Sequence, residues 1–192
     1  MAVLALPRHH ESVDIRVGLI LLLLTAVAAI LPACAPADLR SPTGSVTTIV
    51  LLRHADRNPL QEDLTDEGRE RAAALPKALA GMPIDAIYSL DIKRNLDTAE
   101  PLAKERGLTV KIVRESRVAE QIVRGNPGKT VVWVGNTDNL ADIYSALRGE
   151  GPPPVRYGDL FIVRLPDQGP TMVTKTHYGR PPATARERAP TP

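Results

Sequence analysis

The sequence has a single cysteine, Cys34, in 192 residues. A lone cysteine cannot close an intramolecular disulfide, and it excludes the zinc sites that need two or more thiolates. The chain also has no cluster of histidine, aspartate and glutamate residues with the spacing of metal ligands. We therefore expect one domain, long enough to build a real core, with no metal and no other cofactor.

Aromatic residues and net charge are scarce as well. Phe, Trp and Tyr make up 3% of the chain, and the formal net charge is +2. A nucleic-acid-binding surface needs a basic footprint, and often aromatic side chains on which bases stack. Both are missing, so we expect no nucleic-acid partner. Hydrophobic residues at 43% and charged residues at 24% are instead typical of an ordinary globular protein.

An apolar segment lies near the N-terminus. Residues 17–31 contain no charged residue, and the run is shorter than the roughly 20 apolar residues that a membrane-spanning helix needs. Its length fits the apolar region of a signal peptide, and Leu31-Pro32-Ala33-Cys34 after it resembles a bacterial lipobox, in which the cysteine is lipidated. We expect a lipoprotein signal peptide over residues 1–33, a lipid anchor on Cys34 and a tether over residues 34–45.

Two alternatives stay open for this N-terminus. Cleavage at one of the nearby Ala-x-Ala-like sites would give a soluble secreted protein, and an uncleaved segment would act as a signal anchor. All three readings place the domain outside the cytoplasm. The first makes the chain a membrane-anchored lipoprotein of the cell envelope or periplasm.

The middle of the chain, residues 46–178, alternates short β-rich runs with amphipathic helical patterns, which is typical of an α/β fold. The pattern predicts helices from Asp66 (capped by Thr65), from Lys93 to Glu105, from Val118 and through 140–147, and strands at 46–52, 85–88, 108–113, 130–134, 160–163 and 171–174. Pro76 should kink or split the first helix. Residues 179–192 are proline-rich and lack periodicity, so we expect a disordered tail.

Polar side chains gather after three of the predicted strands. In open parallel sheets, ligands bind beyond the carboxyl ends of strands. Arginine offers a planar fork of donors that matches phosphoryl oxygens, and a neutral imidazole nitrogen can attack phosphorus. A phosphate-sized site is therefore expected here, built from side chains at the ends of the first, second and fourth strands: Arg53, His54 and Asp56; Ser89, Lys93 and Arg94; Asn136 and Asp138.

Several ordered blocks make the resemblance to a family specific. Leu51-Leu52-Arg53-His54-Ala55-Asp56 resembles the Arg-His-Gly motif of the histidine phosphatase superfamily, with alanine in place of glycine. Residues 88–100 are similar to the second block of that family, in which an arginine precedes a Thr-Ala pair, and residues 64–68 and 157–163 fit its small, phosphohistidine-phosphatase-like members. The resemblance implies a phosphoglycerate mutase-like fold, a three-layer α/β/α domain with a mostly parallel central sheet.

The resemblance also implies roles for individual residues. His54 would be the nucleophile that accepts the phosphoryl group, and Arg53 and Arg94 would bind its oxygens. The family's fourth block usually reads Val-Gly-His, whereas this chain has Asn136 in place of the histidine. Asparagine can donate a hydrogen bond to a phosphoryl oxygen, but it adds no positive charge and cannot transfer a proton. The expected catalytic set is Arg53, His54, Arg94 and Asn136, of which the two arginines and the asparagine bind phosphate.

Two functions are compatible with this set. The intact arginines and His54 favour a phosphatase that acts on small phosphate monoesters or phosphohistidine through a covalent phospho-His54. Asn136 favours a degenerate phosphatase, an envelope lipoprotein that binds a phosphorylated or other anionic ligand. Five other residues have weaker claims: Asp56, Glu115 and Asp138 as general acids, Ser89 as a residue that shapes the pocket, and His177 as a substitute imidazole if the fold brings it there.

Overall fold

The computed structural model describes residues 39–114 and 117–180. The predicted signal peptide, Cys34, Glu115 and the tail from residue 181 onward lie outside these ranges. Among the described residues, no helix is both long and apolar enough to cross a membrane.

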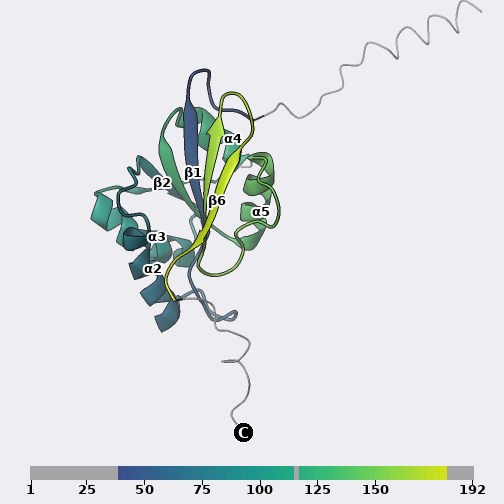
Figure 1. Ribbon diagram of the computed structural model, residues 1–192. Helices are drawn as coiled ribbons and strands as arrows, with labels where there is room; N and C mark the ends of the chain where they lie inside the picture. The colour runs from purple at the N-terminus through teal and green to yellow at the C-terminus, as the bar shows by residue number, and fades with distance from the viewer. Residues whose placement is uncertain (1–38, 115–116, 181–192) are drawn as a thin grey trace, which may run out of the picture. The chain divides into compact units, whose positions relative to one another are not determined.

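A six-stranded mixed sheet forms the middle layer, with the strand order β3-β2-β4-β1-β5-β6 (Figure 1). Its strands are β1 (Val46–Arg53), β2 (Ala86–Ser89), β3 (Val110–Ile112), β4 (Thr130–Gly135), β5 (Asp159–Pro166) and β6 (Met172–His177). The first four run parallel to one another, whereas β5 pairs antiparallel with both β1 and β6. The predicted mostly parallel sheet is therefore confirmed, with an antiparallel hairpin at one edge.

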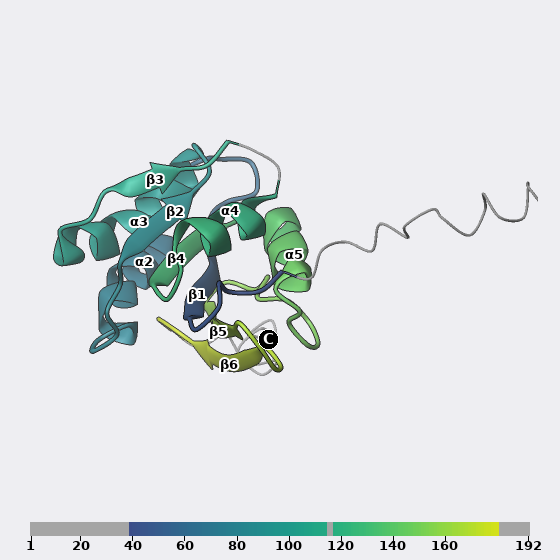
Figure 2. The same cartoon turned by 90° about the horizontal axis from the view of Figure 1, so that it is seen from above.

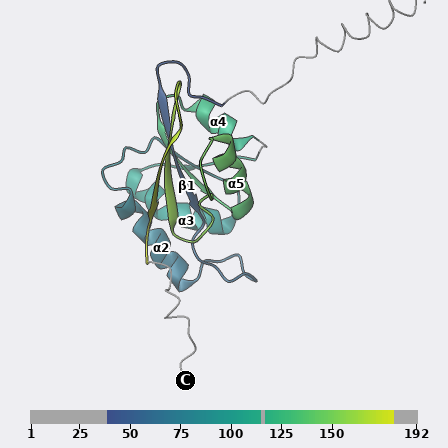
Figure 3. The same ribbon diagram turned by 45° about the vertical axis from the view of Figure 1, so that its right-hand side comes forward.

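Helices cover both faces of this sheet (Figures 2 and 3). On one face, α2 (Asp66–Ala78) and α3 (Lys93–Arg106) pack on alternate residues of β1, Val50 and Leu52. On the other face, α4 (Val118–Gly125) and α5 (Thr137–Ala146) pack on the intervening residues. Because successive strand side chains point to opposite faces, the unbroken apolar run of β1 serves both cores. The predicted three-layer α/β/α architecture is confirmed.

Most predicted helix ends are found where the local chemistry placed them. The Thr65 hydroxyl accepts a hydrogen bond from the Gly68 N–H (3.1 Å) and caps α2, and Gly107 ends α3 with a left-handed φ of 64°. The predicted split at Pro76 does not occur, because α2 continues to Ala78. Pro76 lies in the last turn of α2, and only two helical residues follow it. The backbone N–H that proline lacks therefore removes a hydrogen bond near the end of the helix and not in its middle.

The packed domain extends beyond the boundary predicted at Val46. Leu39 packs against the core, although residues 34–45 were expected to form a tether. The buried Ser41 hydroxyl donates to the carbonyl of Leu165 (2.6 Å), and the Gly44 N–H donates to Asp167 Oδ2 (2.7 Å). These polar contacts attach residues 41–44 to the end of β5, which hydropathy alone does not reveal.

Arg71 in α2 is a buried cation that joins three parts of the domain. It is 7% exposed, and its Nε donates to Asp56 Oδ2 at 2.5 Å, in the loop after β1. Its Nη1 donates to the carbonyls of Tyr178 and Arg180, both at 2.9 Å, just beyond β6. One guanidinium therefore holds α2, the chain after β1 and the end of the sheet together.

Replacing Arg71 by methionine should lower the free energy of unfolding by about 3–5 kcal/mol, because it leaves the Asp56 carboxylate buried without its partner. Arg69→Met is the matched control two residues away. Arg69 is exposed and pairs with an exposed carboxylate, so its loss should cost about 1 kcal/mol or less. Urea denaturation measures both. Equal, small losses for the two variants would show that Arg71 does not have this role.

Candidate active site

The candidate site lies where β1 and β4 end side by side. Arg53 pairs with Gly135 in the parallel register, and the His54 N–H donates to the Gly135 carbonyl at 2.9 Å. His54 and Asn136 are the residues that follow these two strands, so the sheet places them next to each other. Arg94 comes from the first turn of α3. The predicted convergence of strand ends is therefore found in the structure.

His54 is buried, at 2% exposed, and its ring has a defined tautomer. Nδ1 lies 2.8 Å from the Ala55 carbonyl oxygen. A carbonyl only accepts hydrogen bonds, so Nδ1 carries the proton and Nε2 keeps its lone pair. This is the form of imidazole that can attack phosphorus.

The charge state of His54 is set mainly by desolvation. The pKa of His54 is lowered from 6.5 to about 4, chiefly by burial, and the hydrogen bond to Ala55 acts in the opposite direction. The positive charges of Arg53, Arg94 and Arg57 contribute to this lowering, in that order. His54 is therefore neutral at pH 7, because burial and three neighbouring arginines both disfavour its protonated form.

Arg53 is held by the chain that leads into β5. Its Nη1 donates to the Val155 carbonyl (2.9 Å), and its guanidinium carbon lies 4.3 Å from the centre of the Tyr157 ring. The Tyr157 ring is also 5.7 Å from the His54 ring, centre to centre. Tyr157 thus packs against both His54 and its neighbouring cation, Arg53. The sequence identified only the segment around Tyr157, not this contact.

Arg94 is tied to the residue after the nucleophile through Thr98. The Thr98 hydroxyl donates to the Arg94 carbonyl (2.7 Å) and accepts from the Ala55 N–H (2.9 Å). This bridge gives a physical reason for the Thr-Ala pair that follows the arginine in the second block. The Arg94 side chain is 14% exposed, and its Nη1 forms an ion pair with Glu62.

Arg57 is a site residue that the sequence reading missed. Its Nη1 donates to three carbonyls of its own loop, those of Asn58 (3.1 Å), Pro59 (2.9 Å) and Gln61 (3.0 Å). Its charge nevertheless reaches His54, whose pKa it lowers. The only available signal was its position three residues after His54.

The arginines around His54 share an unusual feature. Among the described residues, four arginines have a buried Nε without a hydrogen-bond partner, and three of them are Arg53, Arg57 and Arg94. A buried donor without an acceptor is costly, so a cluster of such donors suits a ligand that supplies acceptors. A tetrahedral oxyanion, with an oxygen for each donor, meets that need.

Asn136 occupies the predicted N-cap position of α5. Its backbone N–H donates to Asn139 Oδ1 (3.0 Å), whereas its own Oδ1 is buried without a partner within the described residues. Gly135 makes this turn possible, because a Cβ there would lie 2.2 Å from Asn139 Oδ1 and 2.4 Å from Trp133 Nε1. Asn136 therefore caps α5 at the strand end beside His54, where only its side-chain NH₂ group could donate to a ligand oxygen.

Two of the weaker candidates, Asp56 and Ser89, are engaged in contacts with the rest of the fold. The Asp56 carboxylate is paired with Arg71, so this candidate general acid has a structural role instead. Asp138 is exposed in the first turn of α5, and Glu115 lies outside the described residues. Ser89 is buried and donates to the carbonyls of Val134 (3.1 Å) and Leu90 (3.0 Å), which fixes the strand end.

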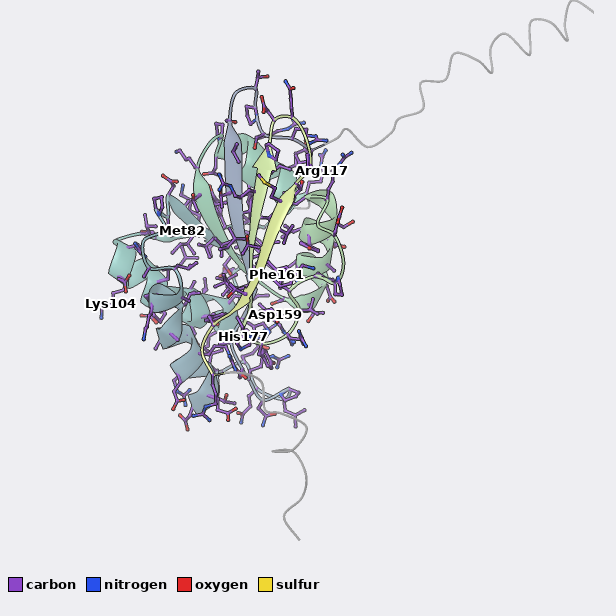
Figure 4. All side chains as sticks on the ribbon, viewed as in Figure 1. Met82, Lys104, Arg117, Asp159, Phe161 and His177 are labelled. Carbon is purple, nitrogen blue, oxygen red and sulfur yellow. The ribbon has the colours of Figure 1, made fainter. Side chains whose placement is uncertain are left out.

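His177 takes part in the Arg71 network. At the end of β6, His177 lies opposite Asp159 in the antiparallel register of β5 and β6 (Figure 4). Its Nε2 lies 3.4 Å from Arg71 Nη1 and 3.1 Å from the Arg180 carbonyl oxygen. Its ring is thus engaged at the edge of the sheet and does not replace the missing imidazole. In the described part of the chain, no group of three or more His, Cys, Asp or Glu side chains could hold a metal ion.

The low pKa of His54 predicts a direction for stability and for titration. Between about pH 6.5 and 4 the unfolded chain binds a proton that folded His54 does not, so stability should fall as the pH is lowered through this range. The His54 Cε1–H signal in NMR should keep its neutral position down to about pH 4. Arg94→Ala should raise the midpoint by removing a nearby positive charge. A midpoint near 6.5 in the wild type would contradict the buried, neutral imidazole.

Comparison with known proteins shows which family the chain is similar to. Residues 49–123 match the family model of the histidine phosphatase superfamily (branch 1). The chain is also 32% identical over 130 residues to phosphoserine phosphatase 1 of Hydrogenobacter thermophilus. That match covers 53% of this chain and 61% of the relative, so the chain spans about three fifths of the relative's length.

Solved structures share the fold at lower sequence identity. The protein histidine phosphatase SixA, complexed with tungstate, has a TM-score of 0.55 at 16% identity, with 68% of this chain and 96% of SixA covered. Bacillus stearothermophilus YhfR has a TM-score of 0.51 at 20% identity, with 61% of this chain and 90% of YhfR covered. With the Arg53-His54 motif at the end of β1 inside the matched segment, residues 49–123 are similar to the histidine phosphatase superfamily.

Proposed function

We propose that the chain is a phosphatase that hydrolyses small phosphate monoesters or phosphohistidine through a covalent phospho-His54. The observation that carries this proposal is the hydrogen bond between His54 Nδ1 and the Ala55 carbonyl. It leaves Nε2 unprotonated in a buried site among three arginines.

In the first step, the Nε2 lone pair attacks phosphorus and forms an N–P bond. The bond from phosphorus to the leaving group breaks, and the leaving atom takes that electron pair and a proton from solvent water. Arg53, Arg57 and Arg94 offer donors to the phosphoryl oxygens, whose charge they stabilise in the transition state. In the second step, water attacks phosphorus, the N–P bond breaks, and phosphate leaves as His54 regains its lone pair.

The substrate class rests on the relatives. One is named a phosphoserine phosphatase and another a protein histidine phosphatase, which has been seen with tungstate, an oxyanion. Both act on a phosphoryl group, as the three arginine Nε donors around His54 would require. We therefore assign a phosphorylated small molecule or a phosphohistidine as the partner of the site.

Asn136 lowers the expected rate. Losing one preorganised donor to a developing oxyanion costs about 2.7–4 kcal/mol, and an amide restores part of that at most. The second candidate function follows from this residue: a binding module that holds a phosphorylated ligand without turning it over. A neutral side-chain NH₂ donor on Asn136 suits either function, so turnover has to decide between them.

Asn136→His should raise turnover of an aryl phosphate at least about tenfold, near 1.4 kcal/mol of barrier, because an imidazolium adds charge beside the phosphoryl oxygens. His54→Ala is the control and should abolish turnover in both backgrounds. If the wild type is already fast and Asn136→His changes nothing, Asn136 does not limit the site. If both proteins bind phosphate but turn nothing over, the binding module is the correct function.

We also propose that the domain is held outside the cytoplasm by a lipid on Cys34. Support comes from the apolar run at residues 17–31 and the lipobox-like residues that follow it. A palmitate analogue fed to the expressing bacterium should label the wild type and not Cys34→Ser. A mature chain that begins beyond Cys34 would show that the anchor is absent.

A further inference from the structure

Glu62 lies at the solvent side of the proposed phosphoryl site. Its carboxylate forms an ion pair with Nη1 of Arg94. The Glu62 side chain is 62% exposed, whereas that of Arg94 is 14% exposed. The carboxylate therefore meets the guanidinium from outside, where the part of a substrate beyond its phosphoryl group would lie.

The loop that carries Glu62 is fixed at several points. Arg57 and Leu64 form an antiparallel bridge that closes its base. Inside the loop, the Arg57 guanidinium donates hydrogen bonds to three backbone carbonyls. The Leu60 N–H donates to Asn58 Oδ1 (3.0 Å). Next to Glu62, Asp63 pairs with Lys93 of α3 at 2.9 Å. Glu62 is thus held in place by its neighbours as well as by its own ion pair.

Charge counting shows what this carboxylate does once a ligand is bound. Arg53, Arg57 and Arg94 bring three positive charges to the site. A phosphoryl dianion balances two of them and Glu62 balances the third. A second anionic group on the ligand, close to its phosphoryl group, would meet Glu62 without a free cation to neutralise it. A cationic group at the same place would gain a partner.

We infer that Glu62 is a specificity-determining residue, which selects phosphoryl compounds with a neutral or cationic leaving group against those that carry a second anionic group. The inference rests on the proposed function, since it concerns the ligand of the same site. The neighbouring acids Asp63 and Asp97 share the single cation Lys93, so together these three residues add one negative charge at this rim. Glu62 differs from them because its carboxylate contacts Arg94, one of the arginines of the proposed phosphoryl site, directly.

Three phosphonates of similar size test this inference without any turnover, because their P–C bond is not cleaved by attack on phosphorus. They are ethylphosphonate, which is neutral beyond its phosphonate group, 2-aminoethylphosphonate, which is cationic, and phosphonoacetate, which is anionic. Calorimetry gives their dissociation constants for the full chain, for Glu62→Gln and for the control Glu105→Gln. Glu105 is exposed at the far end of α3, where it pairs with Arg106.

The wild type and Glu105→Gln should bind phosphonoacetate about fivefold or more weakly than ethylphosphonate, and 2-aminoethylphosphonate at least as tightly as ethylphosphonate. Glu62→Gln should remove most of this discrimination. The inference is overturned if Glu62→Gln leaves the ratios unchanged, if it shifts all three constants by one common factor, or if the wild type binds none of the three. If Glu62→Gln removes the discrimination but the wild type has no phosphatase activity, the proposed catalysis alone is refuted. If the wild type turns over substrate through His54 but Glu62→Gln leaves the ratios of the dissociation constants unchanged, the inference alone is refuted.

Discussion

The geometry of the site depends on the buried ion pair between Arg71 and Asp56. Asp56 follows His54 by two residues, so the guanidinium of Arg71 in α2 fixes the direction in which the chain leaves β1. The backbone carbonyl of Asp56 adds to this, because it accepts hydrogen bonds from the N–H (3.0 Å) and hydroxyl (3.2 Å) of Thr65. Gly68 allows this close approach, since a Cβ there would lie 2.1 Å from that carbonyl oxygen. The loop from Arg57 to Leu64 starts from this fixed point.

A second constraint follows inside the site. His54 has to stay neutral to act as a nucleophile, and the structure achieves this by burying the imidazole among positive charges. The same charges leave several buried N–H groups without acceptors. Burial of the imidazole and unsatisfied arginine donors thus occur in the same place, and an incoming oxyanion would supply acceptors to those donors. Asn136 is consistent with this arrangement as a neutral contact, but it adds no charge of its own.

The sequence predicts the parts of this molecule that depend on local chemistry. β-branched and leucine runs predict β1 and β4, Thr65 predicts the start of α2, and Gly107 predicts the end of α3. The polar residues that follow these strands in the sequence were enough to predict that Arg53, His54, Arg94 and Asn136 share one site.

The residues that were missed depend on contacts between distant parts of the chain. Asp56 is a candidate acid by sequence, and only the fold shows that Arg71, fifteen residues later, takes its carboxylate. Arg57 and Glu62 look like ordinary loop residues until the loop closes over Arg94. Tyr157 lies 104 residues from Arg53. Hydropathy and residue spacing report on neighbouring residues in the sequence and not on contacts between distant ones. These contacts are therefore recognised only in the three-dimensional structure.

Trapping the covalent intermediate tests the central claim most directly. The full chain is mixed with an aryl phosphate, quenched within the first turnovers under alkaline conditions that preserve phosphohistidine, and digested for mass spectrometry. The account predicts one phosphorylated histidine, His54, linked through Nε2, and no phosphorylation in His54→Ala. A phosphoryl group on another residue, or substrate turnover that persists in His54→Ala, would contradict it.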